Sequence, residues 1–167
     1  MRLLLLTLLL TALACDRTSE AVEYGTGSSE QDFWLPLEEA MQLSEQEQKY
    51  VLIDVYTEWC GFCRRMNSET YTDTRVHEAL DNWFLPVRLN AESNEEIAFM
   101  GRTYTKSDLA LQLGVRSYPT TIFLNSEGEP VAAQPGFVEP SRFHHMLSYI
   151  GSERFLSQSF SEYMQSR

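Results

Sequence analysis

The stretch Val51-Leu52-Ile53-Asp54-Val55-Tyr56 runs, after one threonine, into Glu58-Trp59-Cys60-Gly61-Phe62-Cys63. Apart from Asp54, the first run is apolar and rich in residues that favour strands, which predicts a central strand covered on both faces. The two cysteines follow where this strand turns into a predicted helix. Strands joined by helices give an α/β fold, so this stretch indicates the class of the domain.

The flanking segments continue the α/β pattern. Apolar residues at helical spacing predict helices, and short apolar runs bounded by turn residues predict strands. The expected helices are 37–49, 64–70, 73–83, 108–113 (capped by Ser107) and 140–150, and the expected strands are 50–56, 84–89, 120–124 and 129–133. Residues 92–104 are expected to form a loop with a helical piece. The predicted domain, 32–151, is a central mixed β-sheet flanked by helices, with a helical insertion before Pro119 and a helical tail over 152–167.

The N-terminal segment resembles an export signal. One positive charge precedes a leucine-rich run that is too short to span a bilayer permanently, and small residues follow. The run Ala12-Leu13-Ala14-Cys15 resembles the bacterial lipobox, in which the cysteine is acylated and begins the mature protein. We expect a signal peptide over 1–14, lipidation of Cys15 and a flexible tether over 15–31. The alternative is a plain signal peptide in which Cys15 is incidental.

The composition limits the classes of partner. The 167 residues carry a net charge of −11, with 13 Lys and Arg against 24 Asp and Glu. A nucleic-acid backbone requires clusters of Lys and Arg, and the sequence has none, so no nucleic acid is expected as a partner. The 43% of hydrophobic residues is ordinary for a globular domain.

A Cys-x-x-Cys pair can bind a metal, form a structural disulfide or exchange disulfides. A structural zinc site needs about four ligands, usually a second pair of Cys or His. With Cys15 assigned to the anchor, the remaining donors are His77, His144 and His145. The last two are neighbours and point to different sides of a helix, and a structural disulfide usually closes a longer loop. Redox chemistry is therefore favoured, with no metal and no cofactor.

The position of the pair suits that chemistry. Cys60 lies at the predicted N-terminus of a helix, where free backbone N–H groups and the helix dipole favour the thiolate. The thiolate attacks a partner's disulfide and forms a mixed disulfide. Cys63, one turn further along, is close enough to attack that intermediate.

These motifs resemble the thioredoxin superfamily, and in particular its extracytoplasmic thioredoxin-like lipoproteins. The strand and Trp59-Cys60-Gly61-Phe62-Cys63 match the active-site pattern, with Phe62 where thioredoxin has proline. Tyr118-Pro119-Thr120 matches the cis-proline element. The longer stretch between Leu89 and Gly114 departs from thioredoxin and is similar to the insertions of extracytoplasmic members.

The resemblance implies roles for individual residues. Cys60 would be the attacking thiol, Cys63 the resolving thiol, and Asp54 the buried acid that exchanges the proton of the resolving cysteine. The implied substrate-binding residues are Trp59, Gly61, Phe62, Tyr118, Pro119 and Gly136, with Pro119 cis. Purely structural roles stay open for three of these residues. Asp54 could be a strand residue with a local hydrogen bond, Pro119 an ordinary turn proline, and Trp59 a packing residue.

The function expected from these motifs is reduction of disulfides in extracytoplasmic proteins. The partners would be disulfide-containing protein substrates, a membrane thiol-electron donor and the membrane itself through the lipid anchor, in the periplasm or at the cell surface. One alternative is a disulfide oxidant or isomerase. Another is a non-catalytic, membrane-anchored binding or metal-handling module, against which the intact cysteine pair, Asp54 and Pro119 argue.

Overall fold

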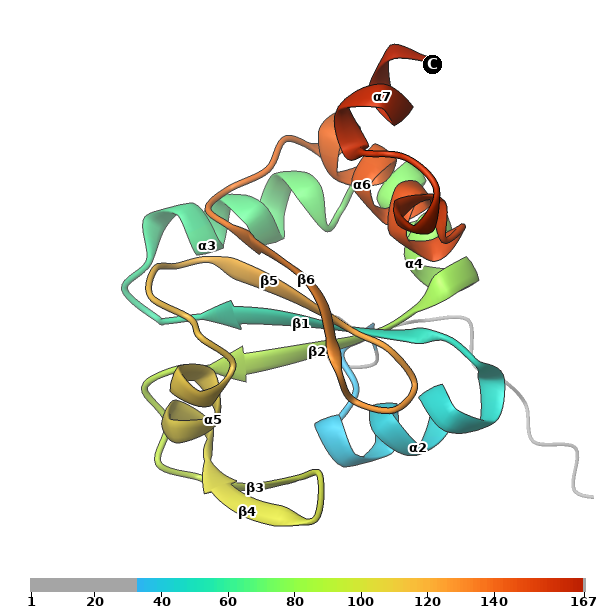
Figure 1. The fold of residues 1–167 in the computed structure, drawn as a ribbon. Coiled ribbons are helices and arrows are strands. Elements are labelled where there is room, and N and C mark those ends of the chain that lie inside the picture. Colours follow the sequence, from blue (N-terminus) through green and yellow to red (C-terminus); the bar gives the residue numbers. More distant parts are fainter. Residues whose placement is uncertain (1–32, 167) are drawn as a thin grey trace, which may run out of the picture.

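The computed structural model describes residues 33–166. The predicted signal peptide, the lipidation of Cys15 and the tether over 15–31 lie outside these residues. A four-stranded sheet forms the centre of the fold, in the order β2-β1-β5-β6 (Figure 1). Its strands are β1 (Tyr50–Tyr56), β2 (Phe84–Asn90), β5 (Thr120–Leu124) and β6 (Pro130–Pro135). β1 is parallel to β2 and antiparallel to β5, and β5 is antiparallel to β6, which confirms the expected mixed sheet.

Helices cover both faces of the sheet (Figure 1). One face carries α3 (Gly61–Arg65), η1 (Met66–Thr70), α4 (Thr74–Trp83) and α6 (Pro140–Gly151), and the other carries α2 (Leu37–Glu47) and α5 (Lys106–Gln112). Successive strand residues point to opposite faces. Val51, Ile53 and Val55 therefore pack on the α2 side, while Leu52 packs on the α4 side. This explains why the apolar run of β1 is continuous rather than alternating.

The segment after β2 differs from the prediction. Residues 92–104 contain no helical piece; β3 (Glu96–Phe99) and β4 (Arg102–Thr105) form an antiparallel hairpin. The side chains of Ile97 and Phe99 alternate with exposed neighbours and pack against the α2 side of the core. The expected helix before Pro119 is present as α5, but the Thr105 side chain caps it, not that of Ser107, by accepting from the Asp108 N–H at 3.0 Å.

Beyond α6 the chain forms the short helix η2 (Arg154–Leu156) and then α7 (Phe160–Gln165). A capping box starts α7, in which Ser159 and Glu162 satisfy each other's backbone N–H groups. The Tyr149 ring of α6 lies 5.2 Å from the Phe160 ring, so α7 packs on the sheet's α6 layer. No helix in the described range 33–166 is long and apolar enough to cross a membrane.

Candidate active site

A disulfide joins Cys60 and Cys63 at the point where the chain leaves β1 and enters α3. The sulfur atoms are 2.03 Å apart and the Cα atoms 5.2 Å apart. Cys60 is the N-cap residue of α3, and its Sγ accepts the backbone N–H of Cys63 at 3.0 Å. A sulfur that accepts this bond at a helix N-terminus is favoured as the thiolate once the disulfide is reduced. Sequence reasoning placed the pair in this setting correctly.

Two large apolar side chains flank the disulfide and face solvent. Trp59 is 66% exposed and Phe62 is 60% exposed. The Trp59 indole Nε1–H donates to Glu92 Oε1 at 2.9 Å, and its ring centroid lies 6.0 Å from that of Tyr118. Exposed apolar side chains held in place around a reactive group form a surface on which a partner can dock. Glu92 was missed from the sequence, because nothing distinguishes it from the other acidic residues after β2.

The cis-proline element lies beside this surface. The Tyr118–Pro119 peptide bond is cis, which confirms the geometry that the resemblance implied, and the Pro119 side chain is buried. The Gly136 N–H donates to the Pro119 carbonyl at 2.8 Å. Gly136 has φ of 83°, a left-handed conformation that favours glycine. The structure therefore brings Trp59, the Tyr118–Pro119 pair and Gly136 together at one end of the sheet, although these three segments are distant in sequence.

Asp54 lies on the face of β1 that α3, η1 and α4 cover. It is 1% exposed, and in the sheet it is paired with Arg88 of β2 and Thr121 of β5. Burial raises the pKa of the Asp54 carboxyl to about 6, while the Arg88 guanidinium and the Tyr71 hydroxyl act in the opposite direction. Neither oxygen of the carboxylate has a hydrogen-bond partner within residues 33–166. A buried acid that titrates near neutrality can accept or supply a proton.

Arg88 and Tyr71 were not identified from the sequence. Arg88 Nε lies 3.6 Å from Asp54 Oδ2, and its guanidinium carbon lies 4.3 Å from the centre of the Tyr56 ring and 5.3 Å from that of Trp34. A single charged residue in the apolar run of β2 was the available signal. Tyr71 carried no signal, because its position depends on how η1 ends.

The two arginines that follow the disulfide, Arg64 and Arg65, contact oxygen atoms of other residues. The Arg65 side chain lies 2.9 Å from Glu69 and 3.3 Å from Glu139, so two carboxylates balance its charge. Arg64 donates to the backbone carbonyl of Glu58 at 3.0 Å. In the part of the chain that the structure describes, no group of three or more His, Cys, Asp or Glu is arranged to hold a metal ion.

Comparison with known protein families identifies the family of this chain. A family model for the thioredoxin-like domain matches residues 37–151. The chain belongs to the thioredoxin-like family. Curated relatives in this family include the thiol:disulfide interchange protein DsbD of Salmonella typhimurium, 28% identical over 153 residues, which covers 86% of this chain and 25% of that protein. DsbD of Escherichia coli K12 is 29% identical over 104 residues, covering 60% and 17%. The chain thus spans a quarter or less of these relatives' length.

Solved structures of thioredoxin-like proteins agree. A thioredoxin-fold protein from Helicobacter pylori superposes with a TM-score of 0.66 at 18% identity, over 72% of this chain and 84% of that one. The oxidised C-terminal domain of Neisseria meningitidis DsbD gives 0.52 at 25% identity, over 67% and 90%. A putative disulphide-isomerase from Bacteroides thetaiotaomicron gives 0.55 at 27%, over 75% and 92%. The chain thus combines a thioredoxin-like domain with a Cys60–Cys63 disulfide at the start of α3.

Proposed function

We propose that this protein reduces disulfides of extracytoplasmic proteins, with electrons from a membrane thiol donor. The observation that carries the proposal is the Cys60–Cys63 disulfide at the start of α3, with the Cys63 N–H directed at Cys60 Sγ. The similarity to proteins named thiol:disulfide interchange proteins supports it. Because those relatives are much longer than this chain, the donor and the substrates are part of the proposal.

In the first step the Cys60 thiolate attacks one sulfur of a substrate disulfide. The substrate's S–S bond breaks, a mixed disulfide with Cys60 forms, and one substrate sulfur leaves as a thiolate. The Cys63 N–H and the helix N-terminus stabilise Cys60 as the thiolate before the attack. Cys60 is therefore proposed as the catalytic nucleophile.

In the second step Cys63 resolves the mixed disulfide. Its thiol gives a proton to Asp54, and the resulting thiolate attacks Cys60 Sγ. The Cys60–Cys63 disulfide forms and the second substrate thiolate leaves, so two electrons have passed to the substrate. A dithiol donor then reduces Cys60–Cys63 by the same exchange in reverse. Asp54 suits its role because burial raises its pKa to about 6.

The surface around the disulfide would receive the substrate. Trp59 and Phe62 offer exposed apolar contacts, and Gly61 between the cysteines leaves room for close approach. We expect an extended substrate segment to pair with the backbone of Tyr118, next to Pro119 and Gly136. Backbone pairing is tolerant of sequence, since specificity comes from side-chain contacts rather than from the main chain.

We infer the direction of electron flow from the thioredoxin-like motif, the presence of Asp54 and the lack of a histidine between the cysteines. Phe62 is neutral and apolar, so it adds no charge that would stabilise the thiolate of the reduced form. We therefore expect a reduction potential nearer that of thioredoxin, about −270 mV, than that of strong oxidants, about −120 mV. The similarity to a putative disulphide-isomerase makes isomerase the second candidate.

The location is proposed from the N-terminal sequence. A leucine-rich run followed by small residues and Cys15 supports export, removal of residues 1–14 and attachment to a membrane by acyl chains. Residues 15–31 would then tether the domain over 32–151 near the membrane, where a membrane donor can reach it. Residues 152–167 would form a helical tail on the domain.

Equilibration of the Cys60–Cys63 pair against glutathione tests the proposal. The fraction of disulfide is read by gel shift after thiol alkylation, and insulin reduction is measured in parallel with Cys60→Ser as the inactive control. We expect a potential below about −230 mV and insulin reduction that depends on Cys60. A potential above about −180 mV would assign the protein to the isomerases or oxidants instead.

A further inference from the structure

The polar groups around Asp54 form a buried cluster on the face of the sheet that α3, η1 and α4 cover. Arg88, Asp54 and Thr121 occupy one row across β2, β1 and β5. The Trp34 ring contacts both Arg88 and Tyr71, so Tyr71 lies next to this row. The hydroxyls of Tyr71 and Thr121 are buried, and neither has a hydrogen-bond partner within residues 33–166. Burying a polar group without a hydrogen-bond partner costs free energy of folding. A cluster of such groups in one place therefore indicates a role beyond packing.

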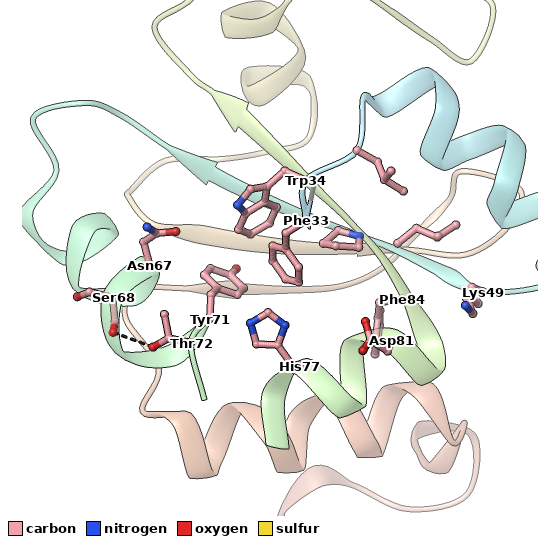
Figure 2. Close-up of a pocket in the computed structure, with 13 residues that line it drawn as sticks. Phe33, Trp34, Lys49, Asn67, Ser68, Tyr71, Thr72, His77, Asp81 and Phe84 are labelled. Atoms are coloured by element: carbon pink, nitrogen blue, oxygen red, sulfur yellow. Dashed lines mark hydrogen bonds between the residues drawn. The ribbon is translucent and has the colours of Figure 1, made fainter. Parts of the chain in front are cut away.

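Aromatic contacts hold the Tyr71 ring in place. It meets the Trp34 ring edge-to-face at 4.9 Å and the Phe143 ring at 5.7 Å, and its backbone N–H donates to the Met66 carbonyl at 3.0 Å. With Trp34 and Phe33, Tyr71 lines a cavity of about 780 Å³ (Figure 2). Tyr71 is nonetheless only 3% exposed. Its ring is therefore held between the Trp34 and Phe143 rings, at the edge of this cavity.

The hydroxyl of Tyr71 is not required for that packing. Phenylalanine would fill the same space, and burying a hydroxyl costs free energy unless a polar group receives it. Burial and the Asp54 charge raise the pKa of Tyr71 well above its ordinary value, so the hydroxyl keeps its proton at neutral pH. A protonated hydroxyl can donate to a carboxylate, and neither oxygen of the buried Asp54 carboxylate has a donor within residues 33–166.

We propose that Tyr71 is a positioning residue for the proposed proton acceptor: when Asp54 is ionised, the Tyr71 hydroxyl turns to donate to its carboxylate and so stabilises the charged form that accepts the Cys63 proton. The inference rests on the role of Asp54 in the proposed function. The charged and titratable groups that interact with Asp54 are Arg88 from β2, Tyr56 from β1 and Tyr71 at the end of η1.

Arg88 provides the second charge-stabilising contact. Its guanidinium lies over the Tyr56 ring and near the Trp34 ring, so it is held 3.6 Å from Asp54 Oδ2. Trp34 thus contacts both groups that favour the ionised acid, Arg88 and Tyr71. The segment that precedes α2 is in this way part of the environment of the buried acid.

The experiment compares Tyr71→Phe with Tyr149→Phe. Tyr149 is a matched control because its hydroxyl donates at 2.7 Å to the Gln158 carbonyl, on α6 and away from the acid. Carboxyl 13C NMR follows the titration of Asp54 in the oxidised protein, and stopped-flow kinetics give the pH profile of mixed-disulfide resolution. For Tyr71→Phe we expect both midpoints to rise by about one pH unit, the size of one hydrogen bond to a carboxylate. Tyr149→Phe should leave both unchanged.

An Asp54 titration that does not move in Tyr71→Phe, or that moves equally in Tyr149→Phe, overturns the inference. Asp54→Asn separates this failure from that of the proposed function. If Asp54→Asn resolves mixed disulfides at the wild-type rate while Tyr71→Phe still shifts the titration, the Tyr71–Asp54 contact is supported and the catalytic role of Asp54 is lost. Thermal melting of each variant checks that the fold is retained.

Discussion

Asp54 of β1 and Arg88 of β2 are direct partners in the parallel strand pair, and Arg88 Nε lies 3.6 Å from Asp54 Oδ2. Asp54 is 1% exposed, whereas the Arg88 side chain is 24% exposed. The guanidinium therefore keeps part of its hydration while the carboxylate loses almost all of it. The pair lowers the cost of ionising Asp54 without removing that cost, because desolvation outweighs the attraction.

Asp54→Asn is expected to make the protein more stable at pH 8. The folded-state pKa of about 6 lies above the ordinary value of 3.8. The protonated form is thus favoured by folding, and this stability is fully present below about pH 4 and is lost as pH rises through the folded-state pKa. At about 1.4 kcal/mol per pKa unit, the loss amounts to about 3 kcal/mol. Urea unfolding at pH 4 and pH 8 measures it; an equal effect of the substitution at both pH values would contradict it.

Cys60, and not Cys63, is expected to be the low-pKa thiol of the reduced protein. Cys60 Sγ receives the Cys63 N–H at the start of α3, whereas Cys63 lies inside the helix. The rate of iodoacetamide alkylation against pH should titrate well below the usual thiol value of about 8.5 in Cys63→Ser. The same measurement on Cys60→Ser should give slower alkylation with a midpoint near or above that value. The reverse order would exchange the proposed roles of the two thiols.

Phe62→His is expected to make the pair more oxidising. An imidazole between the cysteines would add charge that stabilises the Cys60 thiolate, and so favours the reduced form. Phe62 is 60% exposed, so the substitution creates no cavity in the core. Glutathione equilibration should show a potential raised by about 30 mV or more, while Phe62→Pro lowers it or leaves it unchanged. An unchanged potential in Phe62→His would show that this position does not control the redox poise.

Glu92→Ala is expected to weaken substrate reduction without changing the redox potential. Glu92 accepts the Trp59 indole N–H at 2.9 Å and so fixes a side chain of the docking surface. Freeing Trp59 raises the entropy cost of binding, so the KM for a protein disulfide should rise by a few-fold while kcat changes less. Glu127→Ala, an exposed substitution in the β5–β6 turn, is the control. A changed potential with an unchanged KM would contradict this role.

Cys15 is expected to carry acyl chains in the mature protein. The prediction comes from the run Ala12-Leu13-Ala14-Cys15 and the polar, Gly/Ser-rich segment after it. Mass spectrometry of the mature N-terminus should find a lipidated cysteine, and Cys15→Ser should release the protein on osmotic shock. An unmodified N-terminal peptide that begins at another residue would exclude the anchor.

Local sequence patterns were sufficient for much of the fold and of the disulfide's setting. The apolar run of β1, the cysteines at the start of α3 and the Tyr118–Pro119 element were each recognisable from neighbouring residues. Such patterns depend on the alternation of side chains along one strand or helix, so a single segment contains them. The hairpin of β3 and β4 was missed, because short strands are defined by what their buried side chains, here Ile97 and Phe99, pack against.

Tertiary structure alone decided which groups surround the buried acid. The register of β1 against β2 sets Arg88 beside Asp54, since a shift of one residue would turn Arg88 to the opposite face of the sheet. The end of η1 sets where Tyr71 lies. The segment before α2 brings the Trp34 ring against both Tyr71 and Arg88. These contacts join segments far apart in the chain. Their electrostatic effect depends on burial and distance, which no local pattern of residues contains.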